Sequence, residues 1–312
     1  DCQGTAAPAL TRTTIQASTL TPVVIDFTAN PTFSSLVFSS SDNGYDAIGL
    51  RGGTLASGAY SLVQRGATVG INPVSNVSYV LLSSLTVDPG ASLTIQPGVV
   101  VKPLAYVGIS VSGGLAMNGT SAVGDTITFT SISDDNFGNP RDTNNNGSQS
   151  APGRGDWYGI LFQQGSTGSV SYCRRKFGDY AGYGMIWEQN ASIAVSNSLL
   201  SDATHGLGLF GTSSPTVSNV QINNCSSAPV LMSVTANPTF TGVGLLANAI
   251  TAIGLQGEQV AVDSRLSARA LGGYANITYY LMNANLRVMS GATLTIDPGI
   301  VIKHRYDPYS WT

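Results

Sequence analysis

Residues 85–102 read LTVDPGASLTIQPGVVVK, and residues 286–303 read LRVMSGATLTIDPGIVIK. Eleven of the eighteen positions are identical, and the second stretch begins 201 residues after the first. In both stretches apolar residues alternate with polar ones between glycine-containing turns, a pattern typical of short strands with one buried face. The stretch therefore predicts two strands, with Pro-Gly turns at 89–90 and 97–98, and this unit occurs twice in one chain.

The duplication extends beyond this stretch. GTAAPALTRTTIQ (4–16) aligns without gaps with GTSSPTVSNVQIN (211–223), TANPTF recurs at 28–33 and 235–240, and AIGL recurs at 47–50 and 252–255. The offset between the copies changes only from 207 to 201, which small loop deletions explain. Because the segments recur in the same order, we predict one continuous fold over 1–312, with a repeat unit at about 4–210 and a partial second copy at about 211–312.

A shorter period of 22–23 residues runs inside the unit. Val-Ser-Asn occurs at 195–197 and 217–219, and Pro-Thr occurs at 215–216 and 238–239. Apolar residues recur at the same spacing in two columns, which are Val195, Val217 and Phe240, and Leu200, Ile222 and Leu245. Such columns predict a parallel β-solenoid with coils of 22–23 residues, about nine per unit. A string of β-sandwich domains would also alternate, but it would not keep these columns.

The composition agrees with an all-β fold. Only 10% of the 312 residues are charged, with two glutamates and three lysines, so residues that usually coat helices are scarce. Glycine (36 residues), Ser, Thr, Asn and Val suit short strands and tight turns. A net charge of −3 gives no basis for binding nucleic acid, and no apolar run predicts a membrane span.

The termini and cysteines add two expectations. The first ten residues, DCQGTAAPAL, lack the features of a signal peptide, so we expect a mature form or a fragment. The three cysteines (Cys2, Cys173 and Cys225) give no even disulfide framework and no metal-ligand spacing. We therefore expect buried, unpaired thiols.

A family resemblance follows from the order of motifs. The stretch 85–102 is followed by VSGGLAMNGT (111–120), DTITFTS (125–131), an Asp/Asn-rich loop and GDWYGILF (155–162). This succession resembles the secreted right-handed parallel β-helix repeat proteins of bacteria, in particular the large multi-repeat surface proteins of Bacteroidetes and related groups. The resemblance covers nearly the whole chain and implies a right-handed helix and an extracellular or cell-surface location. It implies no single activity, because this fold hosts enzymes, adhesins and passive stalks.

The Asp/Asn-rich segment 134–156 has no strand pattern and is long for a loop. DTNNNG at 142–147 matches the first half of a calcium loop, in which alternate side-chain oxygens surround one cation and the glycine permits a sharp turn. The twelfth position is Gly153 and not the bidentate glutamate of an EF-hand. We predict a candidate structural calcium site formed by Asp142, Asn144 and Asn146, with Asp134, Asp135 or Asp156 as a further ligand. The alternative is a polar loop that binds no ion.

Arg174-Arg175-Lys176 is the one basic cluster in the sequence. The 22–23-residue step aligns it with 197–199 and 219–221, which places Arg175 in a column of small or apolar residues and suggests a bulge or a corner. It could form a patch for acidic polysaccharide or a solvated edge. We favour the solvated edge, because no repeated pair of carboxylates faces the cluster on adjacent coils.

No catalytic constellation emerges from the sequence. The two histidines, His205 and His304, do not make a metal site by themselves, and no local motif supports a Ser-His-Asp triad. No motif pairs two carboxylates as glycoside hydrolysis requires.

The sequence favours a non-catalytic extracellular structural or adhesive repeat protein, such as a stalk, fibre or adhesin segment, because tandem duplication lengthens a scaffold. The alternative is a carbohydrate-active β-helix, either polysaccharide lyase-like or glycan-binding. The chain starts and stops at different phases of the unit, so open strand edges are expected unless YDPYSWT (306–312) caps the helix. The expected partners are further copies of the repeat or other chains, end to end, and surface polysaccharide.

Overall fold

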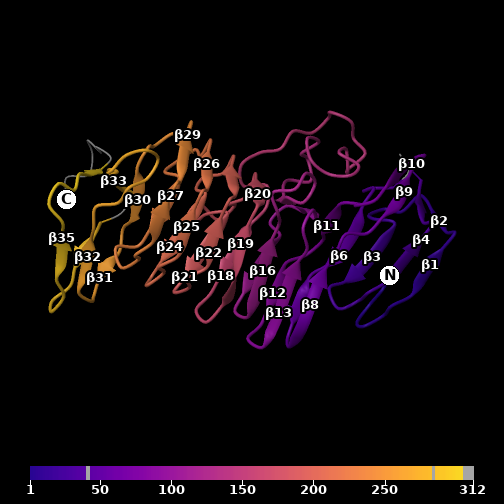
Figure 1. The fold of residues 1–312 in the computed structure, drawn as a ribbon, viewed down its shortest axis with the longest axis horizontal. Coiled ribbons are helices and arrows are strands. Elements are labelled where there is room, and N and C mark those ends of the chain that lie inside the picture. Colours follow the sequence, from indigo (N-terminus) through magenta and orange to yellow (C-terminus); the bar gives the residue numbers. More distant parts are fainter. Residues whose placement is uncertain (40–42, 283–284, 305–312) are drawn as a thin grey trace.

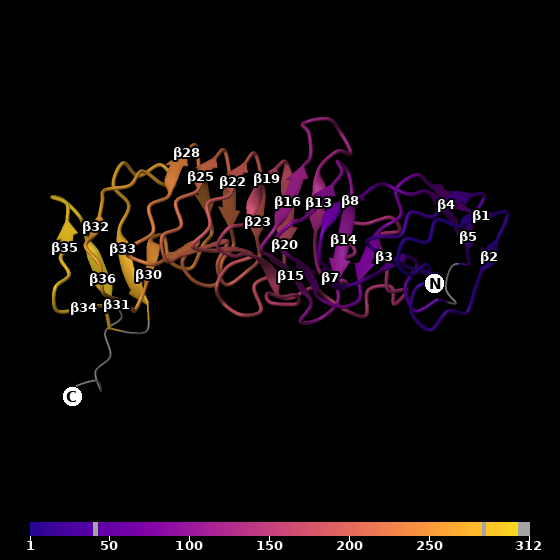
Figure 2. The same cartoon turned by 90° about the horizontal axis from the view of Figure 1, so that it is seen from below.

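The computed structural model describes residues 1–39, 43–282 and 285–304. Within these ranges the chain forms strands and turns, with no helix long and apolar enough to cross a membrane. The strands wind into an elongated right-handed parallel β-helix, seen from two directions in Figures 1 and 2. The prediction of an all-β parallel solenoid is confirmed. The C-terminal YDPYSWT lies outside the described residues.

Three long parallel sheets form the sides of the coil, and we name them A, D and E. Sheet A contains β3 (Val23–Asp26), β6 (Ile48–Arg51), β11 (Tyr79–Leu81), β14 (Val100–Pro103), β17 (Ile127–Phe129), β20 (Cys173–Lys176), β23 (Leu199–Ser201), β26 (Gln221–Asn223) and β29 (Gly244–Leu246). Sheet D contains β7 (Gly53–Leu55), β12 (Leu85–Val87), β15 (Gly108–Val111), β18 (Gly159–Phe162), β21 (Ile186–Gln189), β24 (Leu207–Phe210), β27 (Val230–Met232), β30 (Ile253–Gln256), β33 (Tyr279–Met282) and β36 (Ile302–His304). Sheet E contains β8 (Gly58–Leu62), β13 (Ala91–Ile95), β16 (Gly114–Asn118), β19 (Thr167–Ser171), β22 (Ala194–Ser196), β25 (Thr216–Ser218) and β28 (Thr239–Thr241).

Shorter sheets lie at the two ends of the helix. At the N-terminal end, β1 (Ala9–Thr11) pairs with β4 (Thr32–Ser34), and a second sheet joins β2 (Thr14–Ile15), β5 (Val37–Phe38), β9 (Ala67–Val69) and β10 (Asn72–Val74). At the C-terminal end, β31 (Gln259–Val260) pairs with β34 (Arg287–Val288), and β32 (Ser264–Leu266) pairs with β35 (Leu294–Ile296). All of these pairs are parallel except the β9–β10 hairpin.

The strand register confirms both predicted columns. Val195 pairs with Val217 and Val217 with Phe240 in sheet E, while Leu200 pairs with Ile222 and Ile222 with Leu245 in sheet A. The opening stretch 85–102 forms more than the two predicted strands, because a third strand, β14, begins at Val100 directly after the second Pro-Gly turn.

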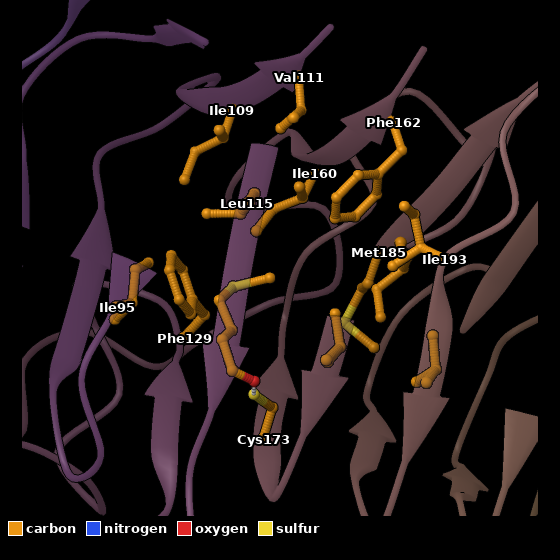
Figure 3. Packing of buried hydrophobic residues seen from close by; sticks show 14 of the residues in the cluster. Ile95, Ile109, Val111, Leu115, Phe129, Ile160, Phe162, Cys173, Met185 and Ile193 are labelled. Atoms are coloured by element: carbon orange, nitrogen blue, oxygen red, sulfur yellow. Dashed lines mark hydrogen bonds between the residues drawn. The ribbon is translucent and has the colours of Figure 1, made fainter. Parts of the chain in front are cut away.

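The inward residues of each strand form one continuous apolar core. Alternate residues of β13 are buried, and Leu93 and Ile95 are almost completely inaccessible to solvent. Figure 3 shows the same arrangement further along the axis, where Leu115 from sheet E and Ile160 and Phe162 from sheet D fill the interior. The inner faces of the three sheets meet inside each coil, and the coils before and after cover that interior, so the stability of one coil depends on its neighbours. The three cysteines are buried and unpaired, as predicted.

The turns between sheets E and A explain the recurring Val-Ser-Asn. Asn197 and Asn219 adopt φ values of 47° and 53°, a left-handed conformation that Asn tolerates better than most residues. Their side chains stack from coil to coil, since Asn219 Nδ2 donates to Asn197 Oδ1 at 3.3 Å. In the next coil Gly242 takes the same position with a φ of 63°. The recurring Val-Ser-Asn triplet therefore encodes a coil corner.

The basic cluster differs from its prediction. Arg175 is completely buried and pairs with Phe129 and Leu200 in the middle of sheet A, so it lies neither at a solvated edge nor at a corner. The expected register was wrong because Arg175 and Leu200 are 25 residues apart, not 22 or 23. Its Nη2 contacts Met117 Sδ at 3.1 Å, while Nε and Nη1 have no hydrogen-bond partner. Burial lowers the pKa of Arg175 to about 10.

The two sequence copies correspond strand for strand except at the β9–β10 hairpin, where the described residues of the second copy form only the isolated bridge between Leu271 and Tyr274. The first residues of β1 to β6 recur, shifted by 207 or 205 residues, in β25 to β30, and the last residues agree to within one position. Buried side-chain contacts recur as well: Tyr79 donates to the carbonyl of Val63 at 2.7 Å, and Tyr279 to that of Ser267 at 2.6 Å. The Arg65–Asn30 contact likewise has its counterpart in Arg269–Asn237.

The copies nevertheless occupy different sheets. The strands β3, β6, β11 and β14 belong to sheet A, whereas their counterparts β27, β30, β33 and β36 belong to sheet D. In sheet A, β26 is the seventh strand after β3, so the two strands are seven coils apart. The next strand of the chain, β27, is the counterpart of β3 and lies on the next side of the coil, in sheet D. A unit therefore contains seven coils and one side. The sequence predicted about nine because it did not allow for the β9–β10 hairpin and the long 131–156 segment.

Candidate functional site

The segment 131–156 is an insertion between β17 and β18, and it contains the stretch 134–156, which forms no strand, as predicted. It covers the outer face of sheet A and projects from the helix between the β11 and β20 labels of Figure 1. The side chain of Lys102 on β14 points outward into it and donates to the carbonyl oxygens of Asp134 at 2.9 Å and Arg141 at 2.8 Å. Gly138 lies directly over Lys102, and a Cβ there would approach Lys102 Cε to 2.9 Å.

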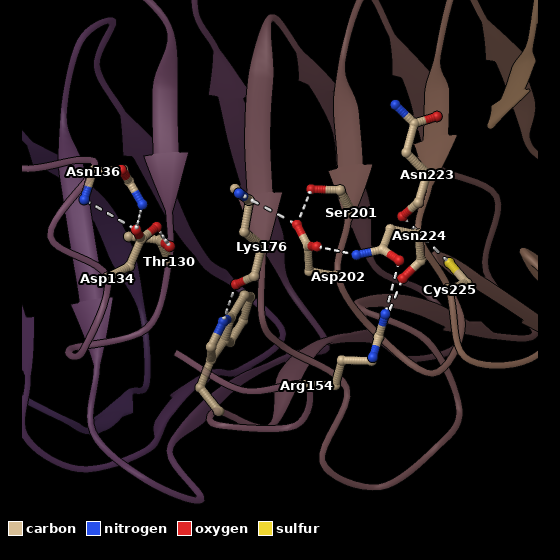
Figure 4. Close-up of polar contacts among 11 residues, drawn as sticks. Thr130, Asp134, Asn136, Arg154, Lys176, Ser201, Asp202, Asn223, Asn224 and Cys225 are labelled. Carbon is tan, nitrogen blue, oxygen red and sulfur yellow. Dashed lines mark hydrogen bonds and ion pairs between the residues drawn. The ribbon is translucent and has the colours of Figure 1, made fainter. Parts of the chain in front are cut away.

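Further contacts fix the insertion to coils on both sides. Toward the N-terminus, the Thr143 carbonyl accepts from the amide of Asp46, and Asn145 donates to the carbonyl of Asn43 at 2.9 Å. Toward the C-terminus, Arg154 Nη2 donates to Asn224 Oδ1 at 2.8 Å, as Figure 4 shows. The insertion thus spans several coils of sheet A.

The predicted calcium ligands divide into two groups. The carboxylate of Asp134 is buried and accepts hydrogen bonds from Thr130 and Asn136, so its oxygens already have donors (Figure 4). Asp156 likewise accepts from Ser131 and from the amide of Gly153. Both residues stabilise turns within the insertion.

The other predicted ligands show a different arrangement. One side-chain oxygen each of Asp135, Asn144 and Asn146 is buried and lacks any hydrogen-bond donor. Asp142 accepts from the amides of Asn146 at 3.1 Å and Gly147 at 2.9 Å, which curls the loop. Burial, followed by the negative charge of Asp142, raises the pKa of Asp135. Buried acceptor oxygens without donors are costly unless a cation or water satisfies them, so these residues suit an oxygen-ligated cation.

Within the described residues no group of three or more His, Cys, Asp or Glu side chains is placed to hold a metal ion. The oxygen set above is not such a group, because two of its members are asparagines.

A second candidate site lies on the outer face of sheet D. A groove with a volume of about 830 Å³ opens there over β18, β21, β24, β27 and β30. Its floor is apolar, formed by Leu161, Trp187 and Phe210, and its rim carries amide side chains. The described lining residues include one carboxylate, Glu258, which accepts from the amide of Val234, and no basic side chain.

Six aromatic rings form a continuous row on this face. Each ring contacts the next in the order Tyr106, Tyr180, Tyr158, Trp187, Tyr183 and Phe210, with centroid separations of 4.5–6.2 Å. Trp187 and Phe210 are largely buried, whereas the four tyrosines are exposed. Sequence reasoning missed this row, because its members come from loops and strands with irregular spacing. The tyrosine-rich YAGYGMIW (180–187) was the one local indication.

Two buried acids lie near the groove but do not open into it. Glu188 pairs with Phe162 and Leu209 inside sheet D, and burial raises its pKa to about 8. Asp179 accepts from the amides of Gly184 and His205, each at 2.7 Å, and burial raises its pKa to about 6. Both are structural: Asp179 organises the loop that carries Tyr180 and Tyr183.

His205, one of the two histidines of the chain, lies in a loop. It is buried between β23 and β24, and its Nδ1 lies 2.6 Å from the carbonyl oxygen of Ala228. His304 ends β36 and is exposed. The two histidines lie in different coils, and neither lines the groove on sheet D.

No protein-family model, curated protein or solved structure matches this chain. The functional proposals below therefore rest on the fold, on the geometry of these two sites and on the residue patterns of the chain itself.

Proposed function

We propose that this chain is a segment of an extracellular structural or adhesive repeat protein that gains length by adding units end to end. The observation that carries the proposal is the pairing of the second copy. Its first three strands, β25, β26 and β27, continue sheets E, A and D from β22, β23 and β24 without interruption. A unit thus joins the preceding one through three parallel strand pairs at once.

The first copy presents the same edges without those partners. Within the described residues, β1, β2 and β3 are the outermost strands of their sheets, and β3 meets only a single bridge from Cys2 to Ile25. This bridge occupies the place of the Leu209–Met232 pair in the second copy. In the second copy, the amide of Gln221 donates to the carbonyl oxygen of Ser198 in the preceding coil at 2.9 Å. In the first copy, Thr14 has the position that corresponds to Gln221. Such edges are complementary to the strands of another unit.

The test is a variant in which residues 159–207 are repeated directly before Asp1. We expect the added strands to stack on β1–β3, to raise the midpoint of thermal unfolding and to slow amide exchange of Thr14 about tenfold or more. A matched control carries Val195→Asp in the added copy only, which buries a carboxylate beside Leu10 and should abolish both effects. Added residues that stay protease-sensitive, with unchanged exchange at Thr14, would contradict the end-to-end arrangement.

Two further parts of the proposal have separate tests. Incubation with acidic and neutral polysaccharides should release no unsaturated or reducing ends, and their appearance would overturn the non-catalytic role. Extracellular or cell-surface placement is supported by the resemblance of the motif order at 85–162 to secreted bacterial repeat proteins. It predicts that antibodies against this chain label intact cells of the source organism.

We also propose that the insertion binds a structural calcium ion. Asp135, Asp142, Asn144 and Asn146 would supply the oxygen ligands, and the three buried oxygens without donors support this assignment. A bound cation would hold the insertion against sheet A. Calcium at 100 times its dissociation constant should stabilise the fold by about 2.7 kcal/mol.

Thermal unfolding with calcium and with a chelator tests this assignment. Asp142→Asn should remove the difference between the two conditions, whereas Asp88→Asn, outside the insertion, should retain it. An unfolding midpoint that does not respond to calcium would exclude the site.

A further inference from the structure

We propose that the groove on the outer face of sheet D binds a neutral polysaccharide chain that lies along the helix axis. This inference goes beyond the structural role proposed above and does not depend on it. The groove and the row of six aromatic rings are on one face, and they share Trp187, Tyr183 and Phe210.

The chemistry of the lining matches a sugar ring. A pyranose presents an apolar face of C–H groups and an edge of hydroxyls, so it can lie against an aromatic ring while its edge meets polar side chains. The groove offers both kinds of group. Its amide side chains, which can donate and accept at once, are Gln163, Gln164, Gln189, Asn190 and Gln256.

Two of these amides are already oriented by hydrogen bonds. Gln163 Nε2 donates to Ser110 Oγ at 2.7 Å, and Asn190 Oδ1 accepts from the amide of Thr212 at 3.0 Å. The other polar atom of each side chain, Oε1 of Gln163 and Nδ2 of Asn190, takes no part in these two bonds and can contact a ligand. Because the polar groups are fixed before binding, less conformational entropy is lost when a ligand is bound.

The charge of the groove selects a neutral glycan. No basic side chain occurs among the described lining residues, and the one carboxylate, Glu258, would repel a polyanion. The basic cluster that might have bound acidic polysaccharide lies on sheet A, where Arg175 is buried in the core. The lining is therefore complementary to uncharged hydroxyl groups.

The row of rings fits a chain that runs along the axis. Tyr106 precedes β15, Tyr158 precedes β18, Trp187 lies in β21 and Phe210 in β24, so the row crosses four successive coils. At a spacing of about 4.8 Å per coil it extends for roughly 14 Å, enough for several linked sugars.

The exposed tyrosines of this protein are concentrated in this row. Tyr106, Tyr158, Tyr180 and Tyr183 are 64%, 38%, 53% and 45% exposed, and among the described residues Tyr274, at 55%, is the one similarly exposed tyrosine elsewhere. Packing within this chain gives no reason for four tyrosine rings to be exposed on one face. A surface on which a ligand stacks, in contrast, needs exposed rings. Tyr274 provides a matched control.

The experiment is native gel electrophoresis of the full chain in gels containing one polysaccharide each: mixed-linkage β-glucan, galactomannan, arabinoxylan or amylose, with alginate and polygalacturonate as acidic probes. We expect retardation by at least one neutral polymer and by neither acidic one. Tyr106→Ala combined with Tyr183→Ala should weaken the interaction about tenfold or more. Tyr274→Ala should bind like the unaltered chain.

Several results would overturn the proposal. These are the absence of retardation by all four neutral polymers, retardation by acidic polymers alone, and retardation that the double variant retains or that Tyr274→Ala equally abolishes. Sedimentation velocity adds a test without glycan: a dimer of this chain that Tyr183→Ala dissociates would show that a second copy covers the groove. Circular dichroism of each variant establishes that it is folded.

Discussion

The buried ammonium group of Lys102 donates to the carbonyl oxygen of Asp134 at 2.9 Å, across the boundary between sheet A and the insertion that covers it. A second bond to Arg141 makes this one side chain a double anchor for a segment without strands. Burial lowers the pKa of Lys102 to about 8, and the carboxylates of Asp134, Asp135 and Asp142 partly oppose that effect.

Lys102→Met should therefore loosen the insertion without disturbing the core. Two carbonyl oxygens lose their donor, so the free energy of unfolding should fall by about 1–3 kcal/mol. Proteolysis within 131–156 should accelerate. Lys303→Met is the matched control, because Lys303 is exposed in β36, and it should change stability by less than about 0.5 kcal/mol. Equal protease resistance of the Lys102 variant and the unaltered chain would show that the anchor is dispensable.

Arg175→Leu should stabilise the protein. The guanidinium group is buried with two nitrogens lacking partners, and its neighbours in sheet A are Phe129 and Leu200. Leucine at this position continues the apolar column and removes a desolvated charge, so we expect a gain of about 1 kcal/mol or more in chemical denaturation. Arg174→Leu, which removes a half-buried arginine over the Phe137 ring, should give no such gain. A loss of stability in Arg175→Leu would mean that the guanidinium is satisfied inside the core.

Glu188 should make stability fall as the pH rises. Its pKa is raised from 4.5 to about 8 in the folded state, so the folded protein binds a proton that the unfolded chain releases. The stabilisation is complete below pH 4.5 and is lost as the pH rises to about 8, on the order of 1 kcal/mol per pH unit. Glu188→Gln should remove this contribution to the slope in urea denaturation between pH 5 and pH 8, and it should leave the contribution below about pH 6 from Asp179, whose pKa burial also raises. Glu258→Gln, which alters the other glutamate, should leave both contributions, and a slope unchanged in Glu188→Gln would refute the assignment.

Asn219→Ala and Asn219→Gly should differ. Both remove the side-chain bond to Asn197, but Ala strains at a φ of 53° and Gly does not. We expect Ala to be less stable than Gly by about 1 kcal/mol. Thermal unfolding of the pair measures this difference directly, and equal midpoints would show that the corner relaxes.

The sequence predicted those parts of the fold that depend on repetition. Columns such as Val195, Val217 and Phe240 were visible because similar side chains pair in successive coils of a parallel stack, separated by a constant number of residues. The prediction failed where the step changes: the 25-residue interval between Arg175 and Leu200 placed a core residue at a solvated edge.

The candidate sites were less accessible to sequence reasoning for the same reason. The oxygen donors at 142–146 are close in sequence and were found, although their unpaired buried oxygens required the structure. The aromatic row joins Tyr106 to Phe210 across more than a hundred residues, and only the stacking of coils brings those rings together. Sites built across coils carry no local motif.

A unit of seven coils and one side has a geometric consequence for any array in which units follow one another as these two copies do. Each unit begins one side further around the coil than its predecessor, because strands that lie in sheet A in the first copy have their counterparts in sheet D in the second copy. Equivalent surfaces are then related by a screw operation, and three units return to the starting direction. Such an array would display its grooves toward every side, so a fibre could engage surrounding material whichever way it is turned.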